Sequence, residues 1–163
     1  MQSSSPLDDK ANLEKLFKEN PENRCLKYIL SNQDAINKLS LDDKNIFYRC
    51  VRTGIDNADS SLGCYAMQPN DYEKFSFFFD KVIRDYHKDE TGSKVHKSDW
   101  DLSKGGDAGV YDVEKLGLEE LSMRVRVGRN LAAFNLPGAM DKAERIKFEQ
   151  TIMKAFDVLI KNE

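Results

Sequence analysis

A chain of 163 residues, 40% of them hydrophobic and 33% charged, is long enough to bury one ordinary core. Its net charge of −3 gives no support for binding to nucleic acid or to an anionic membrane surface. No apolar run reaches the roughly 20 residues of a membrane span, and the N-terminus resembles neither a signal peptide nor a mitochondrial presequence. The three cysteines have no metal-ligand spacing, so we predict no metal site and an intracellular, cytoplasmic location.

The first third of the chain has the pattern of short helices. Residues 1–7 are predicted to be a disordered lead. From residue 8 to about residue 62, apolar residues recur three and four positions apart, as they do on one face of a helix. The motif Ser40-Leu-Asp-Asp43 predicts the N-terminal cap of a longer helix. Turn-forming residues from Asp56 to Gly63 then predict a loop.

A long amphipathic helix is predicted to begin at Pro69-Asn70. Its apolar residues recur at steps of three and four and form one stripe, which further aromatic and aliphatic residues widen. The stripe consists of Tyr72, Phe75, Phe79, Val82 and Tyr86, and it is widened by Phe77, Phe78 and Ile83. We therefore predict that this helix forms the core of a small domain over residues 8–87.

Residues 88–121 are predicted to be a linker, because they contain several glycines and lack apolar periodicity. Within it, the pattern of Val110 to Leu121 is ambiguous, and a short helix is preferred there. The segment Ser122–Val127 then alternates polar and apolar residues, which predicts a half-buried strand with Arg124 and Arg126 on one face. Two adjacent guanidinium groups can bind a phosphate, and a solvated basic edge strand is the alternative.

A closing helix is predicted after the capping motif Asp141-Lys-Ala-Glu144. Its apolar face, from Phe148 to Ile160, is wider than a small domain would cover.

Three segments share a pattern with a known family. The loop Thr53–Tyr65 ends in Gly-x-Tyr, the helix Tyr72–His87 contains Phe-Asp and ends in Tyr-His, and Ser122–Arg129 contains Arg-Val-Arg. Together they resemble the N-terminal part of the phosphagen kinases (ATP:guanido phosphotransferases), and arginine kinases most closely. Order and spacing agree over nearly all of residues 10–163.

The resemblance implies a mainly α fold. It implies a small all-helical guanido-kinase N-terminal domain, then the linker, and over residues 122–163 a strand-plus-helix remnant of the family's α+β C-terminal domain. Members of the family move the γ-phosphoryl group of MgATP onto a guanidine nitrogen, largely by alignment and charge neutralisation.

The resemblance also implies two sets of site residues. By position, Ser122, Arg124 and Arg126 correspond to residues that contact the nucleotide phosphates. Four loop residues correspond to positions that close over the carboxylate end of the guanidino substrate: Ser60, Leu62, Gly63 and Tyr65. The family's catalytic carboxylate motif and its active-site cysteine have no match in this sequence, so we predict no catalytic residue. MgATP is expected only if the nucleotide site is retained.

These features predict a non-catalytic structural or adaptor subunit of a larger assembly. A protein partner is expected to cover the Ser122–Val127 strand and the Phe148–Ile160 helix face, without nucleic acid or membrane insertion. Two alternatives remain: half of an arginine kinase completed by another chain, and a regulatory module that binds ATP or arginine weakly. The family's association with flagella and mitochondria suggests a ciliary complex first and a mitochondrial one second.

Overall fold

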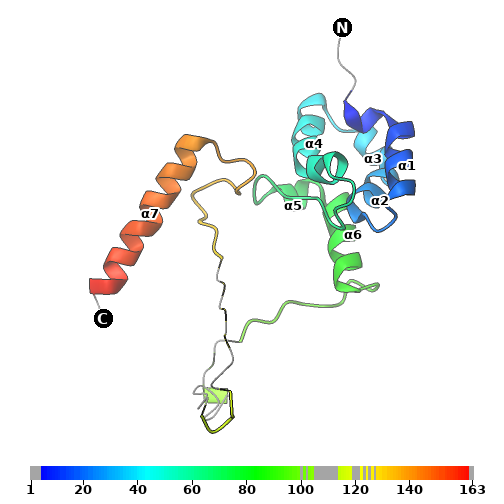
Figure 1. Ribbon diagram of the computed structural model, residues 1–163. Helices are drawn as coiled ribbons and strands as arrows, with labels where there is room; N and C mark the ends of the chain where they lie inside the picture. Colours follow the sequence, from blue (N-terminus) through cyan, green and yellow to red (C-terminus); the bar gives the residue numbers. More distant parts are fainter. Residues whose placement is uncertain are drawn as a thin grey trace. The chain divides into compact units, whose positions relative to one another are not determined.

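The computed structural model describes residues 5–99, 101, 103–104, 114–118, 122, 124, 126 and 128–161. Throughout these residues the regular secondary structure is helical, so the predicted mainly α class is confirmed (Figure 1). The chain divides into two compact units. One combines Met1–Gly92 with Asn130–Glu163, and the other is Ser93–Arg129.

The helices of the described residues are, in chain order, η1 (Pro6–Asp8, a 3-10 turn), α1 (Lys10–Glu19), α2 (Arg24–Leu30), α3 (Gln33–Asn37), α4 (Leu41–Asp56), α5 (Asp71–Lys74), α6 (Ser76–His87) and α7 (Lys142–Lys161). Short connections join them up to α4, and a longer loop, residues 57–70, leads from α4 to α5. The predicted start of α4 is confirmed, since the Ser40 hydroxyl accepts a hydrogen bond from the Asp43 backbone N–H at 3.1 Å.

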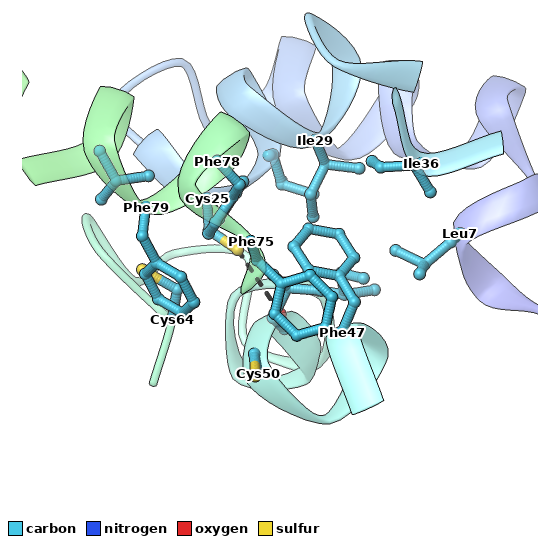
Figure 2. Packing of buried hydrophobic residues seen from close by; sticks show 14 of the residues in the cluster. Leu7, Cys25, Ile29, Ile36, Phe47, Cys50, Cys64, Phe75, Phe78 and Phe79 are labelled. Atoms are coloured by element: carbon cyan, nitrogen blue, oxygen red, sulfur yellow. Dashed lines mark hydrogen bonds between the residues drawn. The ribbon is translucent and has the colours of Figure 1, made fainter. Parts of the chain in front are cut away.

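The core of the helical domain is built around Phe47 of α4. Its ring lies 5.2 Å from the ring centres of both Phe75 and Phe78, and 5.6 Å from that of Phe77. Figure 2 shows the rings of Phe47, Phe75 and Phe78 together with Ile29 of α2. Aromatic clusters of this kind bury large apolar areas, so they dominate the packing free energy of a small domain.

The half-buried carboxylate of Asp85 joins α6 to α2. It accepts hydrogen bonds from Lys27 Nζ at 2.7 Å, from the Tyr28 hydroxyl at 2.8 Å and from Arg24 Nε at 3.3 Å. The bond from Lys27 and, next, the bond from Tyr28 hold the pKa of the Asp85 carboxyl below its usual value.

The lead predicted to be disordered is structured where it is described. Ser5 caps the 3-10 turn η1, and the Leu7 side chain is fully buried in the core. The N-terminus is mostly polar, so its composition does not indicate that the Leu7 side chain packs in the core.

The long helix predicted from Pro69-Asn70 to Tyr86 is two helices. Phe75 separates α5 from α6 with φ −113° and ψ 34°, outside the helical region, so the three-and-four spacing does not continue across it. Tyr72 and Tyr86, at the two ends of the predicted stripe, are 46% and 57% exposed. Phe75, Phe78, Phe79 and Val82 form the buried face.

The strand predicted over Ser122–Val127 is not formed at its described positions. Ser122, Arg124 and Arg126 have no regular secondary structure, and the intervening residues lie outside the described ones. The described residues contain no second strand to satisfy its backbone groups, which a lone strand requires. Of the ambiguous segment Val110 to Leu121, only residues 114–118 are described, and residues 114–117 form turns where the sequence pattern favours a short helix.

Candidate functional site

The predicted substrate loop is attached to α4 through main-chain hydrogen bonds. Gly54 N donates to the Gly63 carbonyl at 2.7 Å, and Tyr65 N donates to the Cys50 carbonyl at 2.8 Å. In a regular helix the Gly54 N–H bonds the Cys50 carbonyl, four residues earlier. Here both of these groups bond main-chain atoms of the loop. The loop therefore lies directly on the last turns of α4.

This attachment requires glycine on both sides. Gly63 has φ +63°, and a Cβ atom there would lie 2.4 Å from the Gly54 Cα atom. A Cβ atom on Gly54 would lie 2.6 Å from the Cβ atom of Cys25 on α2. Three chain segments thus meet at a distance that only glycine permits.

Asn23, only 1% exposed, fixes the other side of the loop. Its side-chain nitrogen donates to the carbonyls of Gly54 and Ala58, each at 2.9 Å, and its side-chain oxygen caps α2 by accepting from Leu26 N. The position before a helix indicates the cap, but the two contacts to residues more than 30 positions away have no local signal in the sequence.

Asp71, which is 2% exposed, holds the chain after the loop. One of its carboxylate oxygens accepts from Met67 N at 2.9 Å and from Gln68 N at 2.8 Å, and the Cys50 thiol lies 3.7 Å from the same oxygen. Sequence reasoning missed this residue, although an acidic residue in the first turn of a helix is a recognised anchor for preceding backbone amides.

The four predicted loop residues are brought together by this arrangement. Leu62 packs against the core, while the Tyr65 side chain is 55% exposed. The Ser60 backbone N–H donates to the Asn57 carbonyl. By contrast, the backbone N–H groups of residues 61–63 donate no hydrogen bond to any described residue. They remain available to an acceptor outside this part of the chain.

The three residues predicted to contact nucleotide phosphates lie in the other unit. Ser122, Arg124 and Arg126 are exposed and belong to Ser93–Arg129. Their proposed contacts with a nucleotide therefore stay a prediction.

A cavity of about 740 Å³ adjoins the loop and α4. The segment after residue 130 closes one side of it, held by a hydrogen bond from Leu136 N to the Met67 carbonyl at 3.1 Å. Charged, aromatic and apolar side chains line the cavity, among them Arg49, Arg52, Asp56, Tyr65, Met67, Tyr72 and Pro137.

The cysteine thiols lie in the core beside this region (Figure 2). Burial raises the pKa of the Cys50 thiol to about 12, with the Asp71 carboxylate adding to the effect, and it raises the pKa of Cys64 to about 11. Burial also raises the pKa of Cys25 well above its usual value. All three thiols are therefore protonated at neutral pH and are poor nucleophiles.

These pKa shifts predict a loss of stability in alkaline solution. The pKa of a cysteine in the unfolded chain is about 8.5, whereas the pKa values of the folded thiols are higher. The raised folded pKa values thus contribute stability that is fully present below about pH 8.5 and is lost as the pH rises above it. Urea unfolding monitored between neutral pH and pH of about 10 should show this fall. The Cys50→Ala variant should show a smaller fall; an equal slope in both proteins would contradict the assignment.

The described part of the chain contains no helix with the length and hydropathy needed to cross a membrane. Nor do its described histidine, cysteine and acidic side chains form a group of three or more that could hold a metal ion.

The helices α2 to α6, together with the Gly-x-Tyr loop that follows α4, correspond to one known class of protein domain. Residues 27–84, from α2 to α6, match the family model described as ATP:guanido phosphotransferase, N-terminal domain. Residues 27–84 thus carry the N-terminal domain of the phosphagen kinases.

Several curated relatives of the chain are arginine kinases. The chain is 38% identical over 110 residues to arginine kinase Oct f 2 of Amphioctopus fangsiao, a match that covers 68% of this chain and 31% of that protein. It is 35% identical over 108 residues to the arginine kinase of Haliotis madaka, covering 66% of this chain and 29% of the relative. The chain thus spans less than a third of these relatives, and the predicted resemblance to their N-terminal part is confirmed.

Proposed function

We propose that this chain is a non-catalytic module, built on a phosphagen kinase N-terminal domain, that serves as a structural or adaptor subunit of a larger protein assembly. The three free cysteines favour a cytoplasmic assembly, and the ciliary axoneme is the first location to test.

The observation that carries this proposal is the apolar face of α7. The described residues of this helix include no buried side chain, and its large apolar residues Ile146, Met153, Phe156, Val158, Leu159 and Ile160 are between 44% and 71% exposed. Helical geometry places all of these except Val158 on one half of the helix with Phe148 and Ile152. An apolar face of this width favours contact with another protein surface over contact with water.

The side chains around the loop support a non-catalytic role. Asp56, the carboxylate that lines the cavity, forms an ion pair with Arg52 at 2.7 Å. Asp71 is engaged by backbone amides, and the three thiols stay protonated. Both carboxylates are therefore already paired within the domain, and none of the three thiols is a thiolate at neutral pH.

The proposal predicts a stoichiometric partner that depends on α7. The tagged chain should be purified from its own cells under native conditions and compared with the double variant Phe156→Glu, Leu159→Lys. We expect native mass spectrometry to show a partner at fixed stoichiometry with the parent chain and not with this variant. Lys154→Glu, a change on the opposite face of α7, is the control and should keep the partner. A solitary chain, or a partner retained by the double variant, would refute the role of α7.

The same preparations should be assayed with MgATP and L-arginine, with ADP release as the readout. We expect no phosphoryl transfer by the purified chain alone. Turnover within about tenfold of a full-length arginine kinase would overturn the non-catalytic assignment. Turnover that appears only with a co-purified chain would favour the alternative, in which this chain is one half of an arginine kinase.

The backbone N–H groups of residues 61–63 donate no hydrogen bond to any described residue, and this favours a second candidate function. These donors and the half-exposed Tyr65 side chain are groups that suit a carboxylate, so weak binding of arginine by the loop is the second candidate. Calorimetric heat with L-arginine that disappears in Tyr65→Ala would support a regulatory module of this kind.

A further inference from the structure

The cavity beside the loop has a surplus of positive charge. Arg49 and Arg52 both project from α4 into its lining, where Asp56 is the acidic residue. Arg52 Nε is paired with Asp56 Oδ2 at 2.7 Å. Among the described residues Arg49 has no ion pair and no side-chain hydrogen bond. One guanidinium group is therefore left to bind a ligand.

The rest of the lining is apolar and aromatic. Tyr65 and Tyr72 border the cavity with rings that are 55% and 46% exposed, and Met67 is buried next to them. Leu136 and Pro137 supply the facing wall. A concave apolar surface with a few placed polar groups is the usual form of a small-molecule site, and a guanidinium group next to it suits planar anionic groups.

We propose that this cavity binds a small organic anion, a carboxylate or phosphate carried on an aromatic or apolar body. Arg49 contacts the anionic group, and Tyr65, Tyr72 and Met67 contact the body of the ligand. This proposal does not rest on the adaptor role, because none of the residues that line the cavity belongs to α7.

The charge of the cavity also separates this ligand from a compound whose only charged group is a cation. A guanidinium group placed here would face Arg49 and the Arg52–Asp56 pair. Its positive charge and that of Arg49 would repel each other. A carboxylate or phosphate of the same size meets no such repulsion. An anion and a cation of matched shape should therefore be discriminated.

Benzoate and benzamidine are such a matched pair, since they share a ring and differ in the sign of charge. The full chain, labelled with ¹⁵N, should be titrated with each compound in low-salt buffer and followed by amide chemical shifts. We expect benzoate to shift the amides of the cavity, including those of Thr53, Asn57 and Met67, and benzamidine to leave them unchanged. Parallel titrations with phenyl phosphate and inorganic phosphate test whether a phosphate replaces the carboxylate and whether the ring is needed.

The variant Arg49→Ala should weaken benzoate binding by about tenfold, as expected for loss of one charge-assisted contact. Lys38→Ala removes one exposed positive charge from a residue that does not line the cavity, and it should leave binding unchanged. Because both side chains are exposed, the variants should keep the parent's circular dichroism and urea midpoint.

Three results would overturn the proposal. They are equal binding of benzamidine and benzoate, chemical-shift changes outside the cavity lining, and unchanged benzoate affinity in a folded Arg49→Ala protein. None of them bears on whether α7 recruits a partner, so the two proposals fail separately.

Discussion

Replacement of Gly63 by alanine is expected to lower the free energy of unfolding by about 3 kcal/mol. The residue has φ +63°, which costs a side-chain-bearing residue about 1 kcal/mol, and its new Cβ atom would lie 2.4 Å from the Gly54 Cα atom. Because that neighbour is a backbone atom of α4, it cannot rotate away, and the loop must separate from the helix. Urea unfolding followed by far-ultraviolet circular dichroism measures the loss.

Gly138→Ala is a matched control on the same cavity. Its Cβ atom would come within 2.9 Å of the terminal methyl group of Met67, which is the far end of a flexible side chain. That group can move, so we expect a change below about 1 kcal/mol. Similar losses in the two variants would show that the loop does not need its close contact with α4.

Phe47→Ala is expected to cost the domain about 4 kcal/mol, the loss typical of a fully buried phenylalanine. The side chain is 0% exposed and contacts the rings of Phe75, Phe77 and Phe78, with ring centres between 5.2 and 5.6 Å away. Its removal leaves a cavity at the point where α4 meets α6. A loss of this size is a large fraction of the stability of an ordinary domain.

The control for Phe47 is a large apolar residue on the same helix. Leu41 is 66% exposed in the first turn of α4, so Leu41→Ala should change the free energy of unfolding by less than about 0.5 kcal/mol. Both variants should be measured by urea unfolding at neutral pH. If Phe47→Ala cost no more than Leu41→Ala, the core would not be centred on Phe47.

Local signals allowed much of this fold to be predicted from the sequence. The Ser40 cap, the turn residues from Asp56 to Gly63 and the Asp141 cap each act through neighbours a few positions away. The Asp141 cap is observed, with Glu144 N donating to its carboxylate at 2.7 Å. The Glu144 carboxylate, however, accepts from Asn135 N at 2.8 Å and so anchors the preceding loop.

Contacts between distant residues account for what the sequence did not predict. Asn23 bonds carbonyls in α4 and in the loop, each more than 30 positions away. The bonds of Asp71, by contrast, reach amides only three and four positions before it, and its place in the first turn of α5 could have indicated them. The non-helical backbone at Phe75 likewise interrupts a spacing that reads as one helix in sequence. The cavity depends on the contact between Leu136 and Met67, and no local pattern in either segment indicates that contact.

The loop's attachment through main-chain atoms has a consequence for how the domain can change. Gly54, Gly63, Cys50 and Tyr65 contribute only amides and carbonyls to it, and Asn23 likewise grips carbonyls. The side chains at positions 61 and 65 therefore point outward without supporting the scaffold. Mutations at these two positions, in nature or in a library, can therefore change what the loop binds. The main-chain hydrogen bonds that hold the loop on α4 would stay the same.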